Sequence, residues 1–252
     1  MKQAEYGAFC RCRDSFRAIA EEIGAGLPDL RKVQQRLIDE RDGPRYSVDT
    51  PVVYNTALDD VDGGAEIKLI LVGDNPGRRE QAAENRRYLV GPSGKIAEKF
   101  FKSESTLGVD FRKNVIILNK TPVHTPRTAD LRDLCRLGGE KMSRVIDASQ
   151  TKMARLLADF FQALRVPVWI TGYSEMRKRG IFERYTAGLE DMVRQGAIDR
   201  DCLFLYRHFS MNQFTIDLRQ KTPPGKSTAE TLPAIGTEYR KRILTENTAW
   251  RH

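Results

Sequence analysis

The stretch Ile67-Lys-Leu-Ile-Leu-Val-Gly-Asp-Asn-Pro-Gly77 decides the fold of this chain. Its first part is an almost continuous apolar run with the length of a buried strand, and its second part is a tight turn bounded by glycines. A strand that lacks an alternating polar face must be covered on both sides, which is typical of parallel sheets in α/β proteins. In open α/β sheets the ligand lies outside the carboxyl ends of the strands, so we expect Asn75 to face a binding site.

Two further strand-like runs end in side chains that can bind or stabilise a heterocycle. Val115-Ile-Ile-Leu-Asn119 ends in an amide, and Cys202-Leu-Phe-Leu-Tyr-Arg-His208 ends in an imidazole that Ser210 follows closely. Each group alone has a simpler explanation, because Asn75 forms turns readily, an Asn can cap a loop and a lone histidine is usually a core residue. Their occurrence at equivalent strand ends predicts that they converge on one candidate active site.

Helical patterns alternate with strand-like runs along the rest of the chain, which predicts parallel strands joined by right-handed crossovers. We therefore predict an α/β fold with three layers, α/β/α, around a central four-stranded, mostly parallel sheet. The further elements expected are a helix from Gly91 to Phe101, a helix over roughly 143–165, a strand over Val166–Thr171, a helix over 182–195, a strand over 202–207 and a closing helix over 228–245.

Two helices are predicted before this core. Apolar residues recur at helical spacing from Phe9 to Ile23, and Gly24-Ala-Gly26 ends that helix. A second helix is expected from Pro28 to Glu40, with Gly43-Pro44 breaking it. We predict residues 1–60 as an N-terminal helical extension packed on the core, and residues 61–252 as the α/β domain with a basic C-terminal tail.

Composition narrows the classes of partner. The 252 residues include 42 Lys and Arg against 34 Asp and Glu, a net charge of +8, which suits a polyanionic partner without requiring one. The four cysteines form no Cys-x-x-Cys pair, so we expect a reducing cytoplasm and no disulfide framework. No stretch approaches ~18 apolar residues, so membrane insertion is not expected. The predicted protein is a cytoplasmic monomer that needs no cofactor and no metal.

Four segments, in order along the chain, resemble motifs of the uracil-DNA glycosylase superfamily. Gly73-Asp-Asn-Pro-Gly77 is similar to the Gly-x-Asn-Pro-Gly motif of the mismatch-specific and single-strand-selective branches, and Val115–Asn119 resembles the strand whose terminal Asn reads the uracil edge. His208-Phe-Ser210 resembles the second motif, usually His-Pro-Ser. Gly91-Pro-Ser-Gly94, after Tyr88, resembles a segment of the thermophilic iron–sulfur branch.

The resemblance covers about Ile67 to Phe214 and implies a uracil-DNA glycosylase-like fold and a monofunctional DNA glycosylase acting on a base flipped out of DNA. It implies that Asn75 positions water, that the Asn119 amide matches the N3–H and O4 of uracil, and that His208 stabilises the anionic base. The candidate residues are Asn75 and His208 for catalysis; Gly73, Asp74, Tyr88, Leu89 and Asn119 for base binding; and Pro76, Gly77, Ser93, Lys95, Ser210 and Met211 for DNA binding.

Several positions depart from the family pattern. Gly77 stands where the strict uracil enzymes carry a Tyr that blocks the thymine methyl, so 5-substituted pyrimidines are expected to fit. Leu89 replaces the aromatic residue expected to stack on the base, and Tyr88 is the candidate substitute. The iron–sulfur branch has a cysteine at the position of Val123, so we expect no cluster.

The second motif and the charged loop leave alternatives open. Phe209 replaces the usual Pro, and either Met211 or Phe209 is a candidate for the apolar wedge that fills the vacated stack, the alternative being a loop hydrophobe. The arginines of the loop either contact phosphates or form a solvated surface; they are Arg78, Arg79, Arg86 and Arg87.

Two other functions stay open at this stage. Leu89 and Phe209 are compatible with a non-catalytic module of the same fold that recognises a modified base. An α/β hydrolase of free nucleotides or nucleosides is a weaker alternative, which predicts turnover of monomeric substrates and little salt-sensitive affinity for DNA.

Overall fold

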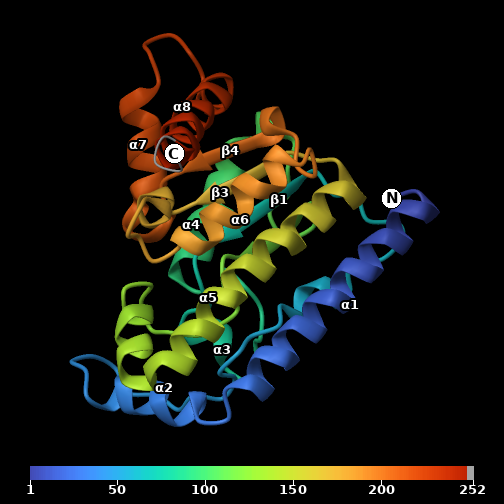
Figure 1. Ribbon diagram of the computed structural model, residues 1–252. Helices are drawn as coiled ribbons and strands as arrows, with labels where there is room; N and C mark the ends of the chain where they lie inside the picture. The colour runs from blue at the N-terminus through green and yellow to red at the C-terminus, as the bar shows by residue number, and fades with distance from the viewer. Residues whose placement is uncertain (249–252) are drawn as a thin grey trace.

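A four-stranded parallel sheet forms the centre of the molecule (Figure 1). The computed structural model describes residues 1–248. The strands are β1 (Leu69–Gly73), β2 (Val115–Asn119), β3 (Val168–Thr171) and β4 (Leu203–Tyr206), and their order in the sheet is β2-β1-β3-β4. All neighbouring pairs are parallel, and helices lie on both sides of the sheet. The predicted three-layer α/β/α class is therefore confirmed.

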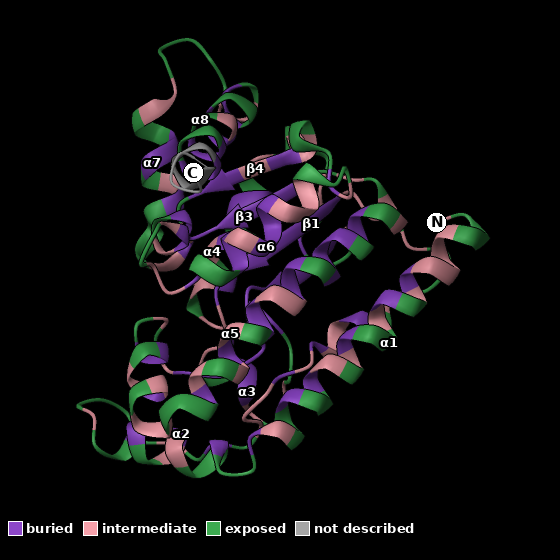
Figure 2. Cartoon of the chain, viewed as in Figure 1, coloured by how far each residue is buried: buried purple, intermediate pink, exposed green. Residues whose placement is uncertain are grey.

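The apolar composition of the strands explains their central position. All five residues of β1 and all five of β2 are buried, and Figure 2 shows the sheet as the most buried part of the chain. The register pairs Gly73 with Asn119 and Thr171 with Tyr206, so the four strands end at one common edge. The polar residues that follow the strands are thereby brought together.

Different helices cover the two faces of the sheet. Trp169 of β3 stacks on Phe101 of α4 (Pro92–Ser103) and on Phe214 of α7 (Gln213–Lys221), so these two helices share its face. In Figure 1, α5 (Asp130–Leu164) and α6 (Glu183–Arg194) lie in front of the sheet and pack on each other. The predicted helices at 91–101 and 182–195 agree with α4 and α6.

Helix α5 begins earlier than the predicted start near residue 143, so that boundary was wrong. Its first segment ends at Gly139, which has φ 74° and interrupts the helical geometry before the chain resumes the helix. Gly138 and Gly139 resemble a helix end in the sequence, and glycine readily adopts this left-handed conformation. Helix α7 was also not predicted.

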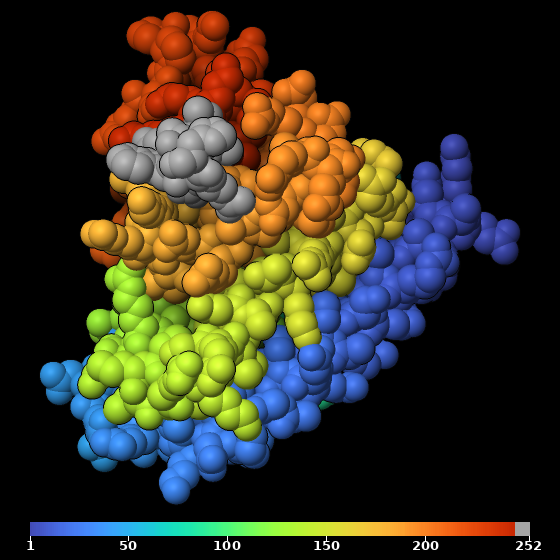
Figure 3. Space-filling model, in the orientation of Figure 1, coloured from blue at the N-terminus to red at the C-terminus, as the bar shows by residue number. Residues whose placement is uncertain are grey.

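The N-terminal helices pack against the core along α5. In Figure 3 the segment of α1 (Gln3–Gly26) forms a continuous layer beside α5, and Phe9 makes an edge contact with Phe160 at a centroid distance of 5.8 Å. Helix α2 (Leu30–Asp39) follows and also contacts α5.

The closing helix and a short helix complete the fold. Helix α8 (Thr228–Thr248) covers β4, where the Tyr206 hydroxyl donates to the carbonyl of Leu232. The short helix α3 (Arg78–Gln81) follows the turn after β1. In the described part of the chain, no helix has the length and apolar character required to cross a membrane.

Candidate active site

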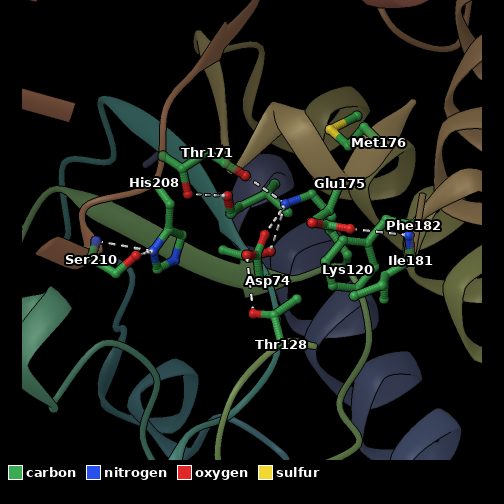
Figure 4. A network of polar contacts seen from close by, with 12 residues as sticks. Asp74, Lys120, Thr128, Thr171, Glu175, Met176, Ile181, Phe182, His208 and Ser210 are labelled. Carbon is green, nitrogen blue, oxygen red and sulfur yellow. Dashed lines mark hydrogen bonds and ion pairs between the residues drawn. The ribbon is translucent and has the colours of Figure 1, made fainter. Parts of the chain in front are cut away.

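The turn after β1 and the residues after β2 and β4 meet at the carboxyl edge of the sheet. Asp74 follows β1, Lys120 follows β2, and His208 lies two residues after β4. Figure 4 shows the His208 imidazole beside the Asp74 carboxylate, with the Lys120 amine on the other side of that carboxylate. The charges of both residues act on the pKa of His208, so the three groups are electrostatically coupled.

Asn119 presents a buried amide with an unused donor. The residue is only 3% exposed, and among the residues that the structure describes its Nδ2 has no hydrogen-bond partner. The side chain lies against Gly73, where a Cβ atom would be only 2.6 Å from Asn119 Oδ1, so glycine is needed at that position. An unpaired buried amide costs about 1–3 kcal/mol, and this cost is regained when a ligand supplies the missing acceptor.

Asn75 is half-buried and its amide orientation is fixed by Thr125. Its Nδ2 donates to Thr125 Oγ1 at 2.9 Å, while the hydroxyl of Thr125 donates to the carbonyl of Arg127 at 2.8 Å. Among the described residues, no donor reaches Asn75 Oδ1. This oxygen is therefore available to accept a hydrogen bond from a water molecule or a substrate.

His208 is held as a neutral imidazole with its proton on Nε2. Its Nδ1 accepts the backbone N–H of Ser210 at 3.0 Å, and Ser210 Oγ lies 2.9 Å from the same nitrogen. Burial lowers the pKa of His208, an effect that the Asp74 charge opposes and the Lys120 charge reinforces. Because Nδ1 is an acceptor, the donor that His208 can offer to a ligand is Nε2–H.

Sequence reasoning missed the buried lysine beside these residues. Lys120 is fully buried, and its Nζ lies 2.5 Å from Asp74 Oδ1 and 2.5 Å from the Thr171 carbonyl (Figure 4). Thr128 Oγ1 donates to the other carboxylate oxygen of Asp74 at 3.2 Å. Burial lowers the pKa of Lys120, and Asp74 opposes that change. The sequence signal was a lysine directly after the strand-like run Val115–Asn119.

The ion pair with Lys120 gives the Asp74 side chain a structural role. Both of its carboxylate oxygens are engaged by Lys120 and Thr128, and the pair joins the ends of β1, β2 and β3. The side chain of Asp74, predicted to bind the base, thus supports the turn that carries Asn75.

A second buried carboxylate holds the turn after Asn75 against the loop before α4. Glu80 accepts the backbone N–H of Gly77 and of Leu89, each at 2.5 Å, and burial raises its pKa to about 7. Leu89 is buried and has φ 52°, and its carbonyl lies so close to Gly94 that no Cβ atom fits there. The Pro76–Gly77 turn is consequently tied to the loop that leads into α4.

The structure corrects the prediction for Tyr88. This residue is 1% exposed, its hydroxyl donates to the Val53 carbonyl at 2.6 Å, and its ring lies near Phe16. Because the ring is enclosed by the core, Tyr88 offers no surface on which a base could stack.

The two candidates for an apolar wedge lie in different environments. Phe209 is fully buried, with its ring centroid 4.3 Å from that of Phe214, so it is a core residue and the wedge prediction for it is wrong. Met211, three residues after His208, is 83% exposed and adopts φ 52°, so its side chain lies on the surface.

The predicted phosphate contacts lie at the surface. Ser93 is half-buried and Lys95 exposed in the first turn of α4. Arg78, Arg79, Arg86 and Arg87 are all exposed. Arg87 pairs with Asp60 at 2.7 Å, and the guanidinium of Arg78 lies over the ring of Tyr46.

His124 connects the turn after Asn75 to the N-terminal segment. It is fully buried, with Nδ1 2.8 Å from the Pro76 carbonyl and Nε2 3.0 Å from the Tyr46 hydroxyl. Burial lowers its pKa to about 4. The neutral ring therefore donates to Pro76 through Nδ1 and accepts from Tyr46 through Nε2.

This histidine makes the stability of the protein depend on pH. Its pKa falls from 6.5 to about 4 on folding, so between these values the unfolded chain binds a proton that the folded chain does not. We expect stability to fall as the pH drops through this window, by roughly 3 kcal/mol from this residue. Urea unfolding of wild type and His124→Asn at pH 4.5, 5.5 and 6.5 measures it.

The variant is the necessary control, because the raised pKa of Glu80 acts in the opposite direction and is present in both proteins. The wild type should lose more stability than His124→Asn as the pH falls. Equal pH slopes for the two proteins would contradict the assignment of His124 as a buried neutral ring.

The comparisons with known proteins found no relative of this chain. No protein-family model, no curated protein and no solved structure matches it.

Among the described residues, no cluster of three or more His, Cys, Asp or Glu side chains could hold a metal ion.

Proposed function

We propose that this chain is a monofunctional DNA glycosylase that removes uracil, or a related 5-substituted or deaminated base, from DNA. The observation that carries the proposal is the buried Nδ2 of Asn119, which has no partner among the described residues. It lies at the strand edge from which Asn75 and His208 also extend.

Recognition in this proposal depends on the pattern of donors and acceptors. Asn119 donates through Nδ2 to the O4 of uracil and accepts the N3–H through Oδ1. Cytosine presents the opposite pattern and would leave buried polar groups unpaired, which gives strong discrimination. The base must leave the helix stack to reach these atoms, at a cost of a few kcal/mol.

The reaction breaks the bond between C1′ of the sugar and N1 of the base. Both bonding electrons leave with the base, which becomes an anion, while the sugar acquires oxocarbenium character. The Nε2–H of His208 donates to the O2 atom of this anion and stabilises its charge. Asn75 Oδ1 accepts a hydrogen bond from the water whose oxygen adds to C1′. That water releases its proton to solvent, and the base is protonated after departure.

The neutral state of His208 suits this role. An imidazolium would carry a proton on Nδ1, where the backbone N–H of Ser210 already donates. A neutral donor stabilises the developing anion without a charge that must first be desolvated. The net charge of +8 adds a general attraction for the phosphate backbone.

An oligonucleotide panel tests the proposal. Single- and double-stranded DNA containing uracil, 5-hydroxymethyluracil, hypoxanthine or xanthine is incubated with the protein, and abasic sites are then cleaved with alkali. We expect product from at least one of these bases with wild type and none with Asn75→Ala. The absence of product from every base would reject the glycosylase.

A non-catalytic module that recognises a modified base is the second candidate. It is favoured by Leu89, a buried aliphatic residue where an aromatic ring is expected to stack on the base. Tight binding to a modified duplex, with no abasic site formed and no change in Asn75→Ala, would support this candidate instead.

A further inference from the structure

A cavity of about 200 Å³ lies beside the candidate active site and has no role in the chemistry proposed above. Its walls come from the segment between Ile38 and Tyr46, from Arg78, and from Pro126 and Arg127. Two of these walls directly continue the active-site turns, because Arg78 follows Asn75 by three residues and Arg127 follows Thr125 by two. The cavity is therefore within roughly 11 Å of Asn75 along the chain.

Hydrogen bonds hold the N-terminal wall of this cavity to the active site. The Tyr46 hydroxyl donates to His124 Nε2 at 3.0 Å, and His124 Nδ1 donates to the Pro76 carbonyl at 2.8 Å. Pro76 is the neighbour of Asn75. The phenol ring is thus fixed at one end, and its position is set relative to the catalytic turn.

The guanidinium of Arg78, a planar cation, lies in the cavity wall and packs on the ring of Tyr46. The guanidinium carbon of Arg78 lies 5.0 Å from the centroid of the Tyr46 ring, which is cation–π geometry. One face of the Arg78 guanidinium is covered by this ring, and the side chain is exposed. Guanidinium planes are surfaces on which single-stranded bases stack.

The charge of the cavity favours an anion. Arg41 is paired with Asp130 at 2.5 Å. Within the described chain, Arg78 and Arg127 form no ion pair, and both are exposed. The lining holds one acidic residue, Asp42, against the two arginines without an ion pair, so the walls carry a net positive charge.

The size of the cavity selects a small group. Pockets for drug-sized ligands have volumes of about 300–1,000 Å³. A cavity of about 200 Å³ suits one ring system with its phosphate at the rim.

We propose that this cavity, the flanking-nucleotide pocket, holds the nucleotide next to the extruded one in the same DNA strand. Its base stacks on the guanidinium of Arg78, which Tyr46 supports from behind, and its phosphate pairs with Arg127. This inference rests on the proposed function, since it names the part of the DNA strand that the enzyme reads beside the excised base.

The test uses single-stranded oligonucleotides that carry the target base with a normal or an abasic nucleotide at one flanking position. Loss of one stacked base is expected to lower kcat/KM about tenfold for wild type, on the 5′ or the 3′ side only. Arg78→Ala and Tyr46→Ala should remove this preference, so that their activities on the two substrates become equal. Tyr46→Phe keeps the ring and should keep the preference.

Arg79→Ala is the matched control, because Arg79 is an exposed neighbouring arginine that does not line the cavity. It should retain the full preference while losing a similar amount of salt-dependent affinity. If Tyr46→Ala does not fold, Arg78→Ala decides the question alone, since its side chain is exposed. A wild-type ratio of one at both flanks, or an unchanged ratio in Arg78→Ala, overturns the pocket.

A binding experiment separates this failure from failure of the glycosylase. Fluorescence anisotropy measures the affinity for the same oligonucleotides with and without the flanking base, which needs no turnover. Discrimination that disappears in Arg78→Ala supports the pocket even if no base is excised. Excision without flank discrimination rejects the pocket and leaves the glycosylase standing, and a protein that binds no oligonucleotide rejects both.

Discussion

Replacing Lys120 by methionine is expected to lower the free energy of unfolding by about 3–5 kcal/mol. Lys120 is fully buried and is the cationic partner of Asp74, which is itself 8% exposed. Methionine fills a similar volume, so little packing is lost, but a buried carboxylate is left without its counter-charge. Urea denaturation at pH 7 measures the difference.

Two further variants identify the cause of this loss. The double variant Asp74→Asn with Lys120→Met removes both charges and should be more stable than Lys120→Met alone, because no buried ion remains unpaired. Lys95→Met, at an exposed position of α4, should change stability by less than about 0.5 kcal/mol. A double variant as unstable as the single one would show that the methionine side chain, and not the unpaired charge, causes the loss.

Replacing His208 by alanine is expected to lower kcat for base excision by about 10²–10³-fold, the usual effect of removing one donor to a developing anion. Ser210 N–H donates to His208 Nδ1, which leaves Nε2–H as the free donor. In the proposed reaction this donor stabilises the departing base, so its removal should slow the chemical step. Single-turnover excision of the preferred base from the oligonucleotide panel measures this effect on the chemical step.

Ser210→Ala is the matched control for His208→Ala. It removes the hydroxyl near Nδ1 but keeps the backbone N–H that fixes the tautomer, so its effect should be much smaller. Both variants should unfold at similar urea concentrations, since the side chains of His208 and Ser210 are both half-buried. Equal losses of turnover in the two variants would argue that the Ser210 hydroxyl, and not the Nε2–H donor, is the important group.

The parts of the site that depend on strand ends could be predicted from the sequence. A continuous apolar run is long enough to identify β1 and β2, and parallel strands bring their carboxyl ends to one edge. Gly73 and Asn119 therefore lie side by side, as their register shows. Local composition is sufficient here, because it identifies the strands and the geometry of a parallel sheet then determines that their ends lie together.

The parts that depend on partners distant in sequence could not be predicted. From the sequence, Lys120 is expected at the surface, because lysine is almost never fully buried without a partner. Nothing in its own segment identifies Asp74 as that partner. Tyr88 and Phe209 were predicted as site residues because they stand at or beside positions of the family motifs, yet their rings pack against Phe16 and Phe214.

The proposed flanking-nucleotide pocket likewise could not be predicted from the sequence, because one of its walls comes from a segment distant in sequence. The residues before Tyr46 were interpreted as part of an N-terminal extension, and no local pattern links them to the turn at Pro76. That link is a buried histidine between two loops, which only the folded chain reveals. Long-range contacts of this kind carry no periodicity that a sequence could display.

The strand order has a consequence for how the chain reaches its native state. Strand β1 pairs with β2 on one side, where Leu69 meets Val115, and with β3 on the other, where Ile70 meets Val168. During synthesis one hydrogen-bonding edge of β1 thus stays open until the ribosome has passed Val168. We expect slow acquisition of structure and a nascent chain that is prone to edge-to-edge association at this stage, as for other topologies rich in non-local pairing.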